Sequence, residues 1–274
     1  MNFSDSRKDN YTKKCQVRAF KVNTSTTDVL FDQVSNSSQF VVGTVIRLSN
    51  EKYLTLKDFS TSSDCHYLQF STFNPKEQVS ITPAQVGVND LVDIENMDSL
   101  HAFLIIKKNN IASLMQISTN WCESKIAKIF ENFGIRVTPS PILKKDVIAR
   151  IKNDGFKALH VNIKVDETDF TNIPGCFSSI FKKEPEIRTK GITGHLTIDA
   201  KGNSELEKSV VNNTSTWIDE LDSDFYLETK KGEKIKGDDL KVIKTYYTVP
   251  YGSKSINAKH AKEILENFVS SGLL

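Results

Sequence analysis

Short segments of alternating apolar and polar residues, joined by tight turns, constrain the fold of this chain most strongly. The clearest pair lies at residues 102–106 and 111–117, around a Lys-Lys-Asn-Asn turn at 107–110. Because asparagine tolerates the positive φ angles of tight turns, this pattern predicts a β-hairpin. Alternation also predicts strands at 16–22, 40–48, 52–56, 65–72, 156–165 and 194–199.

Helical spacing occurs between these strands and at the end of the chain. Ile126, Ile129, Phe130 and Phe133 recur at helical intervals, and Gly134 then supplies a stop. A second stripe, Ala261, Ile264, Leu265 and Phe268, follows a cap at Ser255 or Asn257. Helices are scattered irregularly among local hairpins, and no regular βαβ alternation appears. The sequence therefore predicts an α+β fold with mainly antiparallel sheets.

Composition narrows the class of protein further. With 38% hydrophobic and 26% charged residues among 274, the chain has enough apolar residues for a core, which argues against wholesale disorder. Its longest apolar run, at 102–106, is far shorter than a membrane span, and the N-terminus is polar. We therefore expect a cytoplasmic protein. The four cysteines are isolated from one another, so neither a zinc site nor a disulfide scaffold is expected.

The sequence contains no phosphate-binding loop, dinucleotide fingerprint, hydrolase elbow or metalloprotease motif. A structural role is the better interpretation for each of the five scattered histidines, His66, His101, His160, His195 and His260. One alternative stays open. Asp224, Glu228 and Lys230 resemble part of a Mg²⁺-dependent nuclease site, although these carboxylates lie closer in sequence than is usual. No cofactor is implied, and we expect a binding protein rather than an enzyme.

Lysines are clustered although the formal net charge is only +2. Residues 230–262 hold nine lysines against three acidic residues, with three tyrosines interleaved. Lysine-rich loops suit contact with nucleic-acid phosphates better than the reading of bases. On composition alone a solvated charged surface is the simpler interpretation.

The order of elements resembles the lambda-type RexA phage-exclusion family over most of residues 98–274. Total length is also close, and the soluble component of the Kiwa antiphage system has a similar general character. The segments that carry the resemblance are the hairpin at 103–112, the helix at 124–134, the stretches 145–148, 157–164, 175–181, 196–198 and 223–227, and the helix start at 256–258.

The resemblance implies a cytoplasmic homodimer that binds double-stranded DNA without sequence preference and excludes superinfecting phage. It also implies a small membrane-protein partner. The implied architecture is a globular domain at 1–157 and 241–274, with a smaller mobile insert at 158–240. The family's basic helix after the 196–198 strand has few basic residues here, and residues 204–208 hold two acidic ones. DNA contact is therefore assigned instead to Lys182, Lys183, Arg188, Lys190, Lys230, Lys231, Lys234 and Lys236.

Three hypotheses therefore stand side by side. The first is a DNA-binding phage-exclusion protein, the second is the Mg²⁺-dependent nuclease, and the third is a protein-interaction module without a nucleic-acid role.

Overall fold

The computed structural model describes residues 13–81, 90–115, 122–165, 192–205, 208, 225–251 and 255–274. It is an α+β fold dominated by antiparallel sheets, as the sequence predicts. The chain divides into two compact units. We call Met1–Ile142 with Val242–Leu274 the main unit, and Leu143–Lys241 the inserted unit. None of the helices in the described ranges has the length and apolar character needed to cross a membrane.

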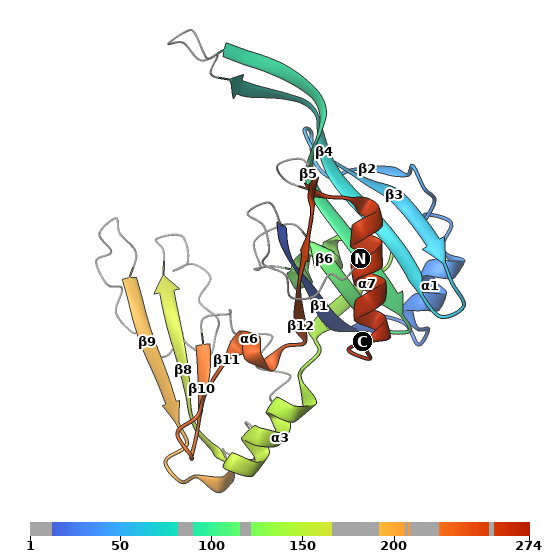
Figure 1. Cartoon of the computed structure of the whole chain (residues 1–274). Helices are drawn as coiled ribbons and strands as arrows, with labels where there is room; N and C mark the ends of the chain where they lie inside the picture. The colour runs from blue at the N-terminus through green and yellow to red at the C-terminus, as the bar shows by residue number, and fades with distance from the viewer. Residues whose placement is uncertain are drawn as a thin grey trace. The chain divides into compact units, whose positions relative to one another are not determined.

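The main unit is built on one antiparallel sheet of eight strands in the order β12-β1-β6-β5-β4-β3-β2, with β7 also paired to β1 (Figure 1). Its strands are β1 (Lys13–Thr24), β2 (Val45–Arg47), β3 (Tyr53–Thr61), β4 (His66–Ile81), β5 (Asp90–Lys107), β6 (Asn110–Met115), β7 (Val137–Pro141) and β12 (Ile243–Thr248). Its helices are α1 (Leu30–Asn36), α2 (Cys122–Asn132) and α7 (Ala258–Ser270), and β13 (Pro250–Tyr251) pairs with β14 (Ser255–Ile256).

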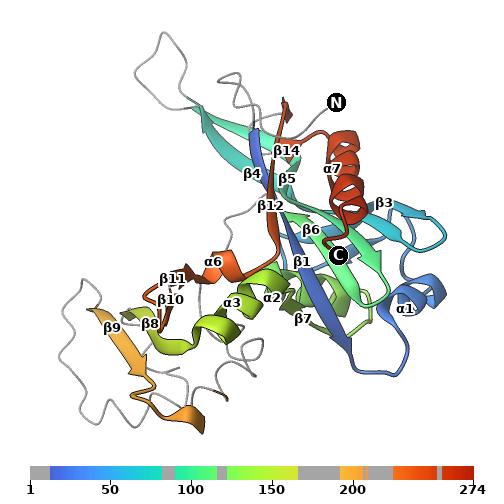
Figure 2. The same cartoon turned by 60° about the horizontal axis from the view of Figure 1, so that its bottom comes forward.

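Both faces of this sheet are buried where its central strands lie. Leu104 and Ile106 of β5 belong to a core with α1 and α2, whereas Phe103 and Ile105 belong to a second core with α7 (Figure 2). Successive residues of a strand point to opposite faces, so a continuous apolar run fits a strand that is covered on both sides. The predicted hairpin is confirmed: β5 pairs with β6 around a turn in which Lys108 has φ 53°.

The two predicted helices of the main unit are confirmed as well. Ile126, Ile129 and Phe130 are buried on α2, and Gly134 follows the helix with φ 79°. Asn257 caps α7, since its side chain accepts a 2.9 Å hydrogen bond from the Lys259 amide. Four apolar residues of α7 are buried in the stripe that the sequence indicates.

Two elements differ from the sequence expectation. Strand β4 extends through Pro75 to Ile81, well beyond the strand predicted at 65–72. Pairing with β3 ends at Phe73, so at Pro75 the described strands leave β4 with β5 as its one neighbour, and proline is tolerated where a strand has an open edge. In the second hairpin, β2 begins only at Val45 rather than at residue 40, because the chain turns through Gly43 at φ 90°.

The inserted unit contains a four-stranded antiparallel sheet in the order β11-β10-β8-β9. Its strands are β8 (Phe156–Val165), β9 (Ile192–Asp199), β10 (Phe225–Thr229) and β11 (Lys234–Lys236), and its helices are α3 (Lys145–Asp154) and α6 (Gly237–Leu240). One face of the sheet packs against α3 and α6. The core residues are Val147, Ile151, Phe156, Leu159, Val161, Ala200, Phe225, Leu227, Ile235 and Leu240.

This unit begins before the 158–240 insert that the resemblance implies. Helix α3 is part of it because Val147 and Ile151 lie in its core. The Lys144 amide also donates to the Leu240 carbonyl at 2.8 Å, and Leu143 forms a bridge with Lys241. The two ends of the insert therefore meet at residues 143 and 241.

The tight packing of Gly237 against Phe225 provides a test of the core of the inserted unit. A methyl group at Gly237 would lie 2.7 Å from a ring carbon of buried Phe225. We expect Gly237→Ala to destabilise the unit by about 1–3 kcal/mol, because the ring has to move within a packed core. Hydrogen exchange at the β8 and β10 amides, measured at increasing urea concentration, gives this loss of stability. Exposed Asp238→Ala is the matched control, and equal stability of both variants would contradict the packing.

Buried His66 gives the main unit a defined response to pH. Its Nε2–H donates to the Phe31 carbonyl at 3.0 Å, so its Nδ1 accepts from the Thr61 hydroxyl at 2.9 Å. Burial lowers the pKa of His66 below 6.5, which means that the fold favours the neutral ring. The unfolded chain therefore binds the proton more readily, and stability falls as pH drops below about 6.5. We expect His66→Gln to flatten this dependence in urea unfolding between pH 7 and 5. An unchanged slope in the variant would contradict it.

Candidate functional site on the inserted sheet

The second face of the inserted sheet carries polar side chains, which we call the polar face. This face arises from strand alternation, because the residues before and after each core residue of a strand point to the opposite side of the sheet. Cross-strand pairing puts His160 between Tyr226 and Thr197, and puts Tyr226 beside Lys236. Directly paired residues of antiparallel strands share a face. The polar face consists of Lys157, His160, His195, Thr197, Asp199, Tyr226, Glu228, Lys234 and Lys236.

A β-bulge brings Lys157 to this face. Glu228 pairs with Ala158 and Thr229 with Phe156, so the register passes over Lys157. The Lys157 Nζ lies 2.7 Å from Glu228 Oε1. This hydrogen bond lowers the pKa of Glu228, with His160 as a further cause, and it raises the pKa of Lys157. Glu228 is therefore a carboxylate at neutral pH.

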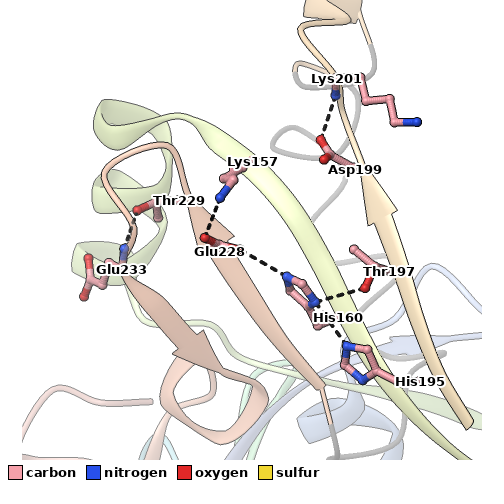
Figure 3. Close-up of polar contacts among 9 residues, drawn as sticks. All are labelled: Lys157, His160, His195, Thr197, Asp199, Lys201, Glu228, Thr229 and Glu233. Carbon is pink, nitrogen blue, oxygen red and sulfur yellow. Dashed lines mark hydrogen bonds and ion pairs between the residues drawn. The ribbon is translucent and has the colours of Figure 1, made fainter.

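A chain of hydrogen bonds runs from Glu228 across three strands (Figure 3). His160 Nε2 lies 3.2 Å from Glu228 Oε2, and His160 Nδ1 lies 3.2 Å from His195 Nε2 and 3.1 Å from Thr197 Oγ1. A carboxylate can only accept, so Nε2 of His160 carries the proton that it donates. In the neutral ring, Nδ1 is then the acceptor, and it faces the Thr197 hydroxyl and the His195 imidazole.

The side chains along this series of hydrogen bonds differ in their exposure to solvent. The side chains of His160 and Glu228 are only 14% and 17% exposed, whereas His195 and Thr197 are exposed. A molecule in solution therefore meets the chain at its His195 and Thr197 end. The carboxylate end is held within the sheet by Lys157.

The aromatic rings of the polar face stack on one another rather than lying open. The Tyr226 and His160 centroids are 4.3 Å apart at 12°, and the His160 and His195 centroids are 5.4 Å apart at 25°. Lys234 Nζ lies 5.1 Å from the centre of the Tyr226 ring. Both sides of Tyr226 therefore have neighbours, and it is poorly placed to stack on a nucleic-acid base. The face offers ring edges and cations instead.

Four of the eight lysines and arginines assigned to DNA contact lie around this face. Lys230 and Lys231 occupy the turn after β10, Lys234 and Lys236 lie on β11, and all four are exposed. Lys231 forms an ion pair with Asp154, whereas neither Lys234 nor Lys236 forms an ion pair with any described residue. The other four, Lys182, Lys183, Arg188 and Lys190, lie outside the described residues.

The acidic residues of the nuclease hypothesis do not form a recognisable metal site within the described ranges. Glu228 engages Lys157 and His160 with its two oxygens, and Asp224 lies outside those ranges. Among the residues that the structure describes, no three His, Cys, Asp or Glu side chains are grouped to hold a metal ion. Asp199, the first residue of an Asp-Ala-Lys triplet, accepts a 2.8 Å hydrogen bond from the Lys201 amide in the turn after β9.

Comparison with known proteins adds no relative: no family model, curated protein or solved structure matches the chain. The site is therefore defined by its own geometry. Sequence reasoning treated His160 and His195 as separate structural residues, and missed their contact. The available signal was that both fall in alternating segments, but only the pairing of β8 with β9 brings them together.

The Glu228 carboxylate is expected to fix the tautomer of His160. Long-range ¹H–¹⁵N NMR spectra at neutral pH should show the Nε2–H form of this ring, and Glu228→Gln should shift the ring toward a tautomer mixture because the amide donates as well as accepts. Asp199→Asn, on the same face, should leave the His160 signals nearly unchanged. An Nδ1–H ring in the unmodified protein would contradict the hydrogen-bond chain.

Proposed function

We propose that this protein binds double-stranded DNA through phosphate contacts, without reading base sequence. As the resemblance to the RexA-type family implies, it would act as a homodimer in the exclusion of superinfecting phage, with a small membrane-protein partner. The observation that carries the DNA-binding part is the placement of exposed Lys234 and Lys236 on the polar face, without ion-pair partners among the described residues.

The charges around these lysines favour an anionic ligand. Two acidic side chains of the same sheet are already paired with other cations: Glu228 with Lys157, and Glu233 with Arg150 at 2.7 Å. Lys231 is held by Asp154, but its side chain is 69% exposed. Exposed ion pairs contribute little to stability, so phosphate competes readily for such a lysine.

The spacing and chemistry of these lysines suit a phosphate backbone. Lys234 and Lys236 are two residues apart on one strand, which places them on the same face about 7 Å apart. Lysine is a compact point charge on a flexible stem, whereas arginine supplies the planar fork that reads guanine. Lysine contacts to phosphate release counterions, and they give affinity that depends steeply on salt and little on sequence.

The β11 lysines give the sharpest test of DNA binding. Fluorescence anisotropy with two unrelated 30-base-pair duplexes, at two salt concentrations and with or without Mg²⁺, should give similar affinities for both sequences. Lys234→Glu with Lys236→Glu should weaken both at least about tenfold, and lower the salt dependence, because each lost phosphate contact reduces the slope by about 0.9.

The matched control is the same double charge reversal at two exposed lysines of the main unit, Lys52→Glu with Lys259→Glu. It has the same net charge as the test variant, so it separates a local surface from a general charge effect. The proposal fails at this surface if both double variants bind equally well, and it fails altogether if the unmodified protein does not bind at low salt.

A further inference from the structure

The contact between two histidines on the polar face has the dimensions of a metal chelate. We propose that His160 Nδ1 and His195 Nε2 together bind one Zn²⁺ ion, or another divalent ion that prefers nitrogen ligands. The sequence predicts no metal in this chain. The inference goes beyond the proposed function, because it does not depend on DNA binding.

Strand pairing brings the two rings together. His160 lies directly opposite Thr197, and His195 precedes Thr197 by two residues on the same face of β9. Such a diagonal pair is within reach of ring side chains. Figure 3 shows that the two rings meet through one nitrogen each, Nδ1 of His160 and Nε2 of His195. Both nitrogens lie on the side of the sheet opposite the apolar core of the inserted unit.

The distance between these two nitrogens fits a shared metal ion. They are 3.2 Å apart. Tetrahedral Zn²⁺ holds histidine nitrogens at about 2.0–2.1 Å, which separates two such nitrogens by about 3.3 Å. The His195 side chain is exposed, so its ring can turn to direct a lone pair at the ion. Chelation therefore requires little movement of either strand.

Glu228 prepares His160 to act as a ligand. Its Oε2 accepts the Nε2–H of His160 at 3.2 Å, which leaves on Nδ1 the lone pair that a metal ion requires. Lys157 holds the other oxygen of this carboxylate at 2.7 Å. Histidines that bind metals commonly donate their second N–H to a carboxylate, which orients the ring and makes it a stronger ligand. This support distinguishes the pair from two histidines that are merely neighbours.

The remaining positions around the ion would be open to solvent. Within the described ranges no third His, Cys, Asp or Glu is grouped with the two histidines. Thr197 Oγ1 lies 3.1 Å from His160 Nδ1, close enough to hydrogen bond to a water molecule on the ion. We therefore expect an accessible ion that binds reversibly, in contrast to a structural zinc with four protein ligands.

The ligand type selects the class of metal. Imidazole nitrogen suits Zn²⁺, Cu²⁺ and Ni²⁺, whereas Mg²⁺ and Ca²⁺ prefer oxygen ligands. The site is thus different from the Mg²⁺ site of the nuclease hypothesis. In the absence of metal, the two nitrogens share a hydrogen, and the ion replaces it. Protons compete with the metal for both rings, so affinity should fall as the pH drops below about 6.5.

The test titrates the full-length protein with ZnCl₂, using calorimetry to measure affinity and ¹H–¹⁵N NMR of the histidine rings to locate the ion. At pH 7 we expect Zn²⁺ to shift the signals of His160 Nδ1 and His195 Nε2 together, and MgCl₂ to leave them unchanged. The affinity should be lower at pH 5. His195→Ala should abolish binding at this site, and Glu228→Gln should weaken it about 10-fold to 100-fold.

The matched control is His260→Ala, which removes a half-buried histidine of the main unit and leaves the pair intact. It should bind Zn²⁺ as the unmodified protein does. His195→Ala should keep the circular dichroism spectrum, because that side chain is exposed. The inference is overturned if excess Zn²⁺ leaves both sets of ring signals unchanged, or if His195→Ala binds as much Zn²⁺ with the same affinity. Duplex-DNA titrations in EDTA test the proposed function separately, so either can fail alone.

Discussion

The number of faces that each sheet buries determines where this protein can expose polar and charged residues on a sheet. A strand presents alternate residues to opposite sides, so a sheet with apolar residues on both sides has to be covered twice. The main unit does this, with α1 and α2 over one face of its central strands and α7 over the other. Among its described residues, the inserted unit has a single core, formed with α3 and α6. The opposite face of its sheet is therefore the one on which polar and charged residues gather.

The local patterns of the sequence were sufficient for much of the fold. The β5–β6 hairpin, α2 and α7 each depend on spacing within a few residues and on a nearby turn or cap, so periodicity finds them. No helix is predicted over α3 in the sequence analysis, and its apolar stripe is short: only Val147 and Ile151 of its ten residues are buried. The boundary of the inserted unit depends on that helix, so it could not be placed from local pattern alone.

The site was much harder to predict, because it depends on the register between strands far apart in the chain. His160 meets His195 from 35 residues away and Glu228 from 68. No local pattern specifies which residues face one another across such distances. The clustering of lysines in the sequence has a related weakness as a predictor of a binding surface. It does not show which lysines form ion pairs within the protein, and in the fold both Lys231 and Lys157 have acidic partners.

The long β4–β5 pair has a consequence for how the protein behaves in a crowded cell. Beyond Phe73 these two strands, which Figure 1 shows as a long ribbon, pair only with each other among the described residues. Open edges of this kind invite the strands of another molecule to add to them. The charged side chains of Lys76, Asp93 and Glu95 are exposed along the ribbon, and bare backbone is difficult to approach past them. We therefore expect these charges to disfavour edge-to-edge pairing between copies of the protein.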